Sequence, residues 1–185
     1  MSSNFVEEMV GEFYRSKGYL VQTNYWFPFE SKRIRKHKDG TQEYSARSWS
    51  DIDVLAVGKD EILVIQVKAI INEAKMAKKI IKYYQRTKAF LESNGTSDAD
   101  APTKWWTQGK KVRNIVVYEF YSVPKYIEIL TNSEIEVHQF SEYFEEIVAL
   151  TEKKKGFKEE NALMRMIHFL NHNHYLNISK TKESF

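Results

Sequence analysis

Four polar side chains interrupt the apolar segment SDIDVLAVGKDEILVIQVKA, residues 50–69, and their types can do chemistry. They are Asp51 and Asp53 near its start and Gln66 and Lys68 near its end. Carboxylate and amide oxygens are suitable ligands for a hard divalent cation such as Mg²⁺. An ammonium group beside them could orient or deprotonate a water molecule, or neutralise charge on a phosphoryl transition state. The set therefore suits the hydrolysis of a phosphate ester.

These side chains meet if the segment forms a hairpin whose two-residue loop is residues 59–60. In that register Asp53 lies opposite Gln66, and Asp51 lies opposite Lys68. Because side chains alternate along a strand, all four then project from one face. A shift of one residue in the loop would separate them. The opposite face is expected to be apolar throughout: Ile52, Val54, Ala56, Leu63, Ile65 and Val67.

A purely structural role for these residues is the alternative. Asp51 and Lys68 would then form an ordinary ion pair at the end of the sheet, with Asp53 and Gln66 hydrogen-bonded beside them. Buried charges need partners whether or not they take part in a reaction. The spacing alone leaves both interpretations open.

The rest of the chain predicts elements that can position this hairpin. Apolar residues at helical spacing predict helices over residues 4–17, 73–93, 124–131, 141–155 and 160–175. Alternating or continuous apolar runs predict strands over residues 19–27, 112–120 and 134–140. The basic stretch SKRIRKHKDG, residues 31–40, is expected to be a loop with a turn at Asp39-Gly40.

This order of elements, αβββαβ followed by αβα, predicts an α/β protein with a mixed central sheet flanked by helices. Crossover helices make the later strands parallel to their neighbours, and the apolar hairpin is expected in the middle of the sheet. The length of 185 residues predicts a single domain, residues 1–185. Its core is expected at about residues 4–140, followed by a C-terminal helical extension at about 141–185.

Composition limits the function classes. Hydrophobic residues make up 42% of the chain, and no apolar run approaches the ~20 residues that cross a bilayer. The amino terminus lacks the pattern of a secretory signal, and the absence of cysteine excludes disulfide and thiolate chemistry. We therefore expect a cytoplasmic protein without a membrane partner. The net charge of +3 is compatible with nucleic acid without arguing for it.

The motif pattern resembles the PD-(D/E)xK nuclease superfamily over about residues 5–140. The segment Asp53-Val-Leu-Ala is similar to that family's aspartate followed by two apolar residues and alanine, and Gln66-Val-Lys68 is similar to its (D/E/Q)xK element. The segment VEEMVGEFYRSKGYLV is similar to the opening of Mrr-type restriction endonucleases and archaeal-type Holliday-junction resolvases. Ile52 stands where the family usually has proline, and Gln66 where it usually has an acid. The Mrr-type branch is similar in using QxK.

This resemblance implies a restriction-endonuclease-like fold and a metal-dependent DNA endonuclease that acts in restriction or defence, repair or recombination. It implies Asp53, Gln66 and Lys68 as catalytic residues. Glu7, Asp53 and Gln66 would bind Mg²⁺, for which Mn²⁺ could substitute, and Glu8 and Asp51 would support them. A homodimer and a separate recognition subunit are compatible with the resemblance.

Given that fold, basic residues are candidates for contact with the phosphate backbone of DNA. They are Lys32, Arg33, Arg35, Lys36, Arg47, Lys79 and Lys82. Trp105 and Trp106 could stack on a base, or could instead anchor a loop on the core. Because Gln66 supplies fewer negative charges than an acid, a catalytically silent DNA- or protein-binding module on the same fold is the alternative. A nuclease that acts on RNA also stays open.

Overall fold

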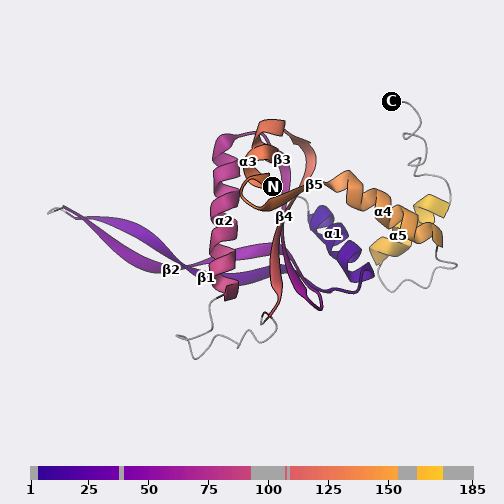
Figure 1. Ribbon diagram of the computed structural model, residues 1–185, viewed down its shortest axis with the longest axis horizontal. Coiled ribbons are helices and arrows are strands. Elements are labelled where there is room, and N and C mark those ends of the chain that lie inside the picture. Colours follow the sequence, from indigo (N-terminus) through magenta and orange to yellow (C-terminus); the bar gives the residue numbers. More distant parts are fainter. Residues whose placement is uncertain (1–3, 38–39, 93–106, 108, 154–161, 173–185) are drawn as a thin grey trace.

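The alternation of strands and helices in the sequence produces a five-stranded mixed sheet between two layers of helices (Figure 1). The structure is a computed structural model, and it describes residues 4–37, 40–92, 107, 109–153 and 162–172. Its strands are β1 (Leu20–His37), β2 (Gly40–Val57), β3 (Glu61–Ile71), β4 (Lys111–Ser122) and β5 (Ile135–Gln139). No helix within these ranges is long and apolar enough to cross a membrane.

The strands follow one another in sequence order across the sheet, from β1 at one edge to β5 at the other. β1, β2 and β3 are antiparallel, whereas β3, β4 and β5 are parallel. The parallel connections run through α2 (Ala74–Glu92) and α3 (Pro124–Thr131). The expected αβββαβ order is confirmed, and β3 lies in the centre of the sheet as expected for its apolar sequence.

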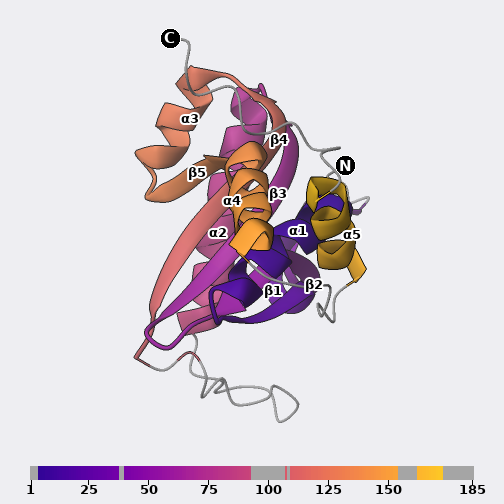
Figure 2. The same cartoon turned by 90° about the vertical axis from the view of Figure 1, so that its right-hand side faces the viewer.

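Each sheet face is covered by its own helices (Figures 1 and 2). On one side, α1 (Asn4–Ser16) and α4 (Phe140–Lys153) pack on the sheet and α5 (Ala162–His172) packs against α4, and we call this the α1 side. On the other side, α2 and α3 pack on it, and we call this the α2 side. The α1-side core includes Val6, Val10, Val54, Ala56, Leu63, Ile65, Val67, Ile115 and Ile147. The α2-side core includes Phe27, Ile52, Leu55, Ile62, Val64, Ile80, Tyr84, Val116 and Leu130.

The helices after residue 140 contribute to the core on the α1 side. Tyr143, Ile147 and Val148 of α4 and Ile167 of α5 are buried in the same apolar cluster as α1 and the sheet. The apolar stripe of α4 therefore completes the cover of the α1 side.

The strand expected to stop at Pro28 continues to His37, so the prediction of a basic loop is wrong. β1 pairs with β2 without interruption from Pro28 opposite Trp49 to His37 opposite Gly40. A proline is tolerated there because β1 is an edge strand. The far halves of β1 and β2 project past α2 as a two-stranded ribbon (Figure 1). We call residues 29–37 and 40–48 the arm.

The turn between β2 and β3 has the predicted register. The backbone N–H of Gly58 donates to the carbonyl of Glu61 at 2.9 Å, and Leu55 lies opposite Val64. The paired ladder, however, ends at Val54 opposite Ile65. The expected backbone pairs of Asp53 with Gln66 and of Asp51 with Lys68 therefore do not form.

Where β2 and β3 separate, one extra residue in β2 shifts the alternation of its side chains between the two faces of the sheet. Val54 packs on the α1 side, but Ile52 packs on the α2 side together with Leu55. β1 makes the same change at Asn24, whose φ of 52° lies in the left-handed region that asparagine tolerates better than most residues. Thr23 lies opposite Val54 and Tyr25 opposite Ile52, so the two irregularities face each other. Ile52 is therefore not on the predicted apolar face.

Candidate active site

Asp53 occupies the gap where β2 and β3 separate. Only 8% of its surface is exposed, and its Oδ2 accepts a hydrogen bond of 2.7 Å from the backbone N–H of Val67. The carboxylate thereby accepts from an N–H of β3 beyond the last paired residues of the ladder. This bond fixes the side chain of Asp53 against the backbone between Gln66 and Lys68.

Lys68 reaches the same carboxylate. Its Nζ lies 3.6 Å from Asp53 Oδ2 and donates a hydrogen bond of 2.8 Å to the carbonyl of Val67. The sequence prediction that Asp53 and Lys68 come together is confirmed. The alternative ion pair of Lys68 with Asp51 is not the one that forms, because Lys68 pairs with Asp53. Asp51 lies opposite Trp26 and is half-buried.

The electrostatics of Asp53 favour a cation beside it. Burial raises the pKa of Asp53, and the negative charge of Asp51 adds to that rise. The ammonium of Lys68 and the N–H of Val67 oppose it without reversing it. Asp51 therefore acts on the site through its charge. A further positive ion at the carboxylate would relieve the penalty of burial.

A cavity of about 580 Å³ opens next to Lys68, between β3 and α2. β3 contributes Gln66 and Lys68 to its lining, and α2 contributes Met76, Lys79, Ile80, Lys82, Tyr83 and Arg86. Two buried oxygens of lining residues have no hydrogen-bond partner, Gln66 Oε1 and Tyr83 Oη. Buried polar atoms normally find partners, so these two oxygens are available to a ligand or water in the cavity.

Tyr83 is the residue of this site that the sequence did not indicate. Burial raises its pKa well above the ordinary value, so its hydroxyl stays protonated. The neighbouring Tyr84 is ordinary core, because its hydroxyl donates to the carbonyl of Ile115. A tyrosine on the apolar stripe of a helix is normally a core residue. Only the position of α2 over Gln66 shows that Tyr83, unlike Tyr84, belongs to the site.

Glu7 and Glu8 lie near the start of α1, on the α1 side of the sheet. Glu8 Oε1 accepts a 3.4 Å hydrogen bond from Thr23, which lies opposite Val54, the residue after Asp53. Glu7 is 7% exposed and follows Val6, which shares an apolar cluster with Val54. Within the described ranges, no three His, Cys, Asp or Glu side chains are grouped so that they could hold a metal ion. A metal site here would therefore depend on the Gln66 oxygen as well as on carboxylates.

The basic candidates divide between two locations. Lys79 and Lys82 line the cavity beside Gln66 and Lys68. Lys32, Arg33 and Arg35 lie on the arm in β1 rather than in the expected loop, and Arg47 lies on the arm in β2. The side chain of Lys36 lies outside the described part of the structure, and so do Trp105 and Trp106.

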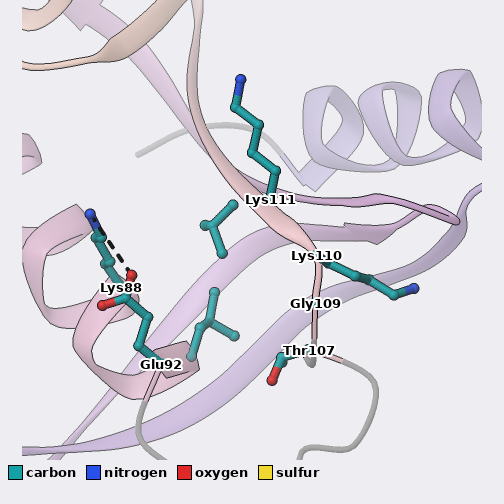
Figure 3. A pocket seen from close by; sticks show the side chains of 8 residues that line it. Lys88, Glu92, Thr107, Gly109, Lys110 and Lys111 are labelled. Carbon is teal, nitrogen blue, oxygen red and sulfur yellow. Dashed lines mark ion pairs between the residues drawn. The ribbon is translucent and has the colours of Figure 1, made fainter.

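A second cavity, of about 480 Å³, lies at the other end of α2 and has a different character (Figure 3). Lys88, Glu92, Lys110 and Lys111 are among its lining residues. Lys88 pairs with Glu92 at 3.8 Å, and Lys110 Nζ donates to the carbonyl of Gly58 at 2.5 Å. Among its described lining residues there is neither a buried carboxylate nor a buried oxygen without a partner, unlike in the first cavity.

Comparisons with known proteins do not identify a family. No known protein family matches the sequence, and no curated protein matches it. A crystal structure of a protein of unknown function, AF1548, is similar with a TM-score of 0.43 and 15% sequence identity. The match covers 75% of this chain and 58% of that one, so the chain spans less than two thirds of the other protein's length.

Proposed function

We propose that this protein is a metal-dependent DNA endonuclease with a restriction-endonuclease-like fold. The observation that carries the proposal is the contact of Asp53 with Lys68 at the splayed end of β2 and β3. The unpaired Gln66 oxygen lies two residues before Lys68, and both residues line the same cavity. This cavity is also lined with further cations from α2, which would attract phosphate.

The donor set fits a small hard cation. Asp53 and Gln66 would hold Mg²⁺ or Mn²⁺ through oxygen, with Glu7 as a further carboxylate, and Mg²⁺ ordinarily keeps several waters in such sites. The unpaired Gln66 Oε1 and the burial-raised pKa of Asp53 both support this fit, because a cation would relieve both penalties. When bound, the ion would polarise a phosphate oxygen and lower the pKa of a water molecule.

The protein's own groups have separate tasks in this proposal. The N–H of Val67 fixes the Asp53 carboxylate, and the Val67 carbonyl fixes the Lys68 ammonium on the same strand. Lys68 then orients the attacking water or stabilises negative charge on the phosphoryl group. Lys79 and Lys82, at the wall of the cavity, would position the phosphate that is cleaved.

One observation favours a second candidate, a DNA- or protein-binding module that does not cleave. Gln66 is neutral, and the described residues contain no group of three acidic or other metal-binding side chains. A site with fewer negative charges binds a divalent cation more weakly. The same chemistry would also serve an RNA substrate, because a metal-activated water does not itself select the sugar.

A metal-dependence assay tests the proposal. Purified protein is incubated with supercoiled, linear and branched DNA, and with RNA, in Mg²⁺, in Mn²⁺ or in EDTA. We expect cleavage of DNA with either metal and none in EDTA. Tight DNA binding without cleavage in any metal would contradict the proposal and favour the binding module, whereas cleavage of RNA alone would change the substrate class.

A further inference from the structure

The two faces of the arm differ in how their positive charges are matched. Residues opposite each other in antiparallel strands share a face, so Arg33 lies beside Tyr44 and Arg35 beside Gln42. Phe29 projects from the same face and packs in the α2-side core, so we call this the inner face. The described side chains of the inner face beyond Phe29 are Ser31, Arg33, Arg35, Gln42, Tyr44, Ala46 and Ser48.

No acid stands among those inner-face side chains. Arg33 donates a hydrogen bond of 3.3 Å to the Ser48 hydroxyl, which leaves its positive charge unneutralised. At the base of the arm, the Arg86 guanidinium of α2 lies 4.4 Å from the centre of the Phe29 ring. Arg86 also lines the cavity that contains Gln66 and Lys68. The inner face therefore continues as a basic tract from the arm through Arg86 to the candidate active site.

The cations on the opposite, outer face stand beside acids of the arm, because Glu30 lies opposite Arg47 and Glu43 beside Lys32. Lys32 Nζ lies 3.7 Å from a carboxylate oxygen of Glu43. The Arg47 guanidinium lies 5.3 Å from the centre of the Trp49 ring. Because Glu43 beside Lys32 and Glu30 opposite Arg47 offset these two charges, the outer face attracts a polyanion less strongly than the inner face.

The dimensions of the arm fit a duplex. It has nine residue pairs, from Phe29 opposite Ser48 to His37 opposite Gly40. At about 3.3 Å per residue the arm reaches roughly 26 Å, which approaches the ~34 Å of one turn of B-form DNA. A two-stranded ribbon also fits the major groove, which is about 12 Å wide.

We propose that the inner face of the arm, through Arg33 and Arg35, binds double-stranded DNA and guides its backbone along Arg86 to the cavity at Lys68. This inference deepens the proposed function and relies on it for the identity of the polymer. It separates cations of the same arm by face: Arg33 and Arg35 contact phosphates, whereas Lys32 and Arg47 do not.

Two double variants test the face assignment, Arg33→Ala with Arg35→Ala and Lys32→Ala with Arg47→Ala. Each removes two positive charges from the arm, so total charge is matched. Binding of a fluorescent 30-base-pair duplex and of the equivalent single strand is measured by anisotropy over a range of salt concentrations, in EDTA. Thermal melting of both variants confirms that they fold.

We expect the inner-face variant to lose about tenfold or more in duplex affinity at low salt, and the slope of log affinity against log salt to fall by about 1.8, since each phosphate contact contributes about 0.9. The outer-face variant should change affinity less than about threefold. Equal losses in the two variants would overturn the face assignment. Equal affinity of the wild type for duplex and single strand would overturn the duplex as its ligand.

The EDTA condition separates this inference from the proposed function. A face-specific loss of duplex binding in a protein that cleaves nothing in Mg²⁺ or Mn²⁺ would leave the arm as a DNA-binding element and refute the nuclease. If the wild type cleaves DNA but the two variants bind the duplex equally, the nuclease is supported and the face assignment of the arm is refuted.

Discussion

Asp53 is a buried carboxylate that the folded protein keeps at a cost in stability. Burial places its pKa in the folded state above the value in the unfolded chain. Between those two values the folded state binds more protons, so the free energy of unfolding falls as pH rises through that window. Above that window the penalty is present in full. A residue retained at such a cost is expected to have a role other than stability.

Asp53→Asn should therefore increase stability while it removes function. The amide oxygen can still accept from the N–H of Val67, but the buried charge is gone. We expect a higher melting temperature at pH 7, a weaker pH dependence of stability above pH 4, and loss of metal-dependent cleavage. Thermal melts from pH 4 to 8 measure the first two. A lower melting temperature at pH 7 would instead indicate that the Asp53–Lys68 pair is structural.

Tyr83 and Tyr84 form a matched pair of adjacent buried tyrosines. Tyr84→Phe removes a hydrogen bond to Ile115 and should lower the free energy of unfolding by about 1 kcal/mol. Tyr83→Phe removes an unpaired hydroxyl, so stability should be unchanged or higher, while cleavage falls if that hydroxyl contacts substrate or water in the cavity. Urea denaturation compares the two. Equal destabilisation would mean that the Tyr83 hydroxyl has a partner within the fold.

Among these site residues, the sequence predicted the meeting of Asp53 and Lys68, because a two-residue turn fixes the register of a short hairpin. It did not predict that the Asp53 side chain bonds the N–H of Val67, because that follows from the early end of the ladder. Tyr83 was beyond prediction, since its role depends on where α2 lies over β3.

At the scale of elements, Arg113 connects three strands at the end of the sheet opposite the candidate site. From β4 it contacts Glu61 of β3 at 3.0 Å and Glu136 of β5 at 2.7 Å. Arg113 lowers the pKa of Glu136, and hydrogen bonds from Tyr19 and Arg113 lower that of Glu61. Their stabilisation is thus present above the carboxylates' unfolded-state pKa and is lost as pH falls through the lowered values.

Arg113→Met should lower the free energy of unfolding at pH 7 by about 1 kcal/mol, a modest amount because the groups are partly exposed. The difference from the wild type should shrink as pH falls from 5 towards 3, because the carboxylates lose their charge. Urea denaturation at several pH values measures this. A difference that is independent of pH would show that Arg113 acts by packing and not by charge.

Hydrophobic periodicity predicted the order of the helices and strands. It did not predict two features of the strands. Pro28 and the run of basic residues indicated a loop, whereas an edge strand accommodates both. The slip of alternation at Asn24 and Asp53 is invisible in the sequence, because it depends on one left-handed residue in the partner strand.

At the scale of the whole molecule, α4 and the sheet form one core. Ile147 is 1% exposed in the α1-side cluster, whereas Ile34, on the arm, is 69% exposed. Ile147→Ala should reduce the free energy of unfolding by about 2–5 kcal/mol. The same exchange at Ile34 should change it by less than about 0.5 kcal/mol. A small effect at Ile147, measured by urea denaturation, would show that α4 is dispensable to the core.

We propose that the Asp53–Lys68 site cleaves DNA, and cleavage rates of Lys68→Ala under single-turnover conditions with Mg²⁺ test this most directly. Lys88→Ala is the matched control, because that lysine lines the other cavity and pairs with Glu92. We predict that Lys68→Ala lowers the rate by about 10²–10⁴-fold, with duplex binding in EDTA unchanged within a few fold, and that Lys88→Ala cleaves like the wild type. Cleavage by Lys68→Ala at the wild-type rate would contradict the claim.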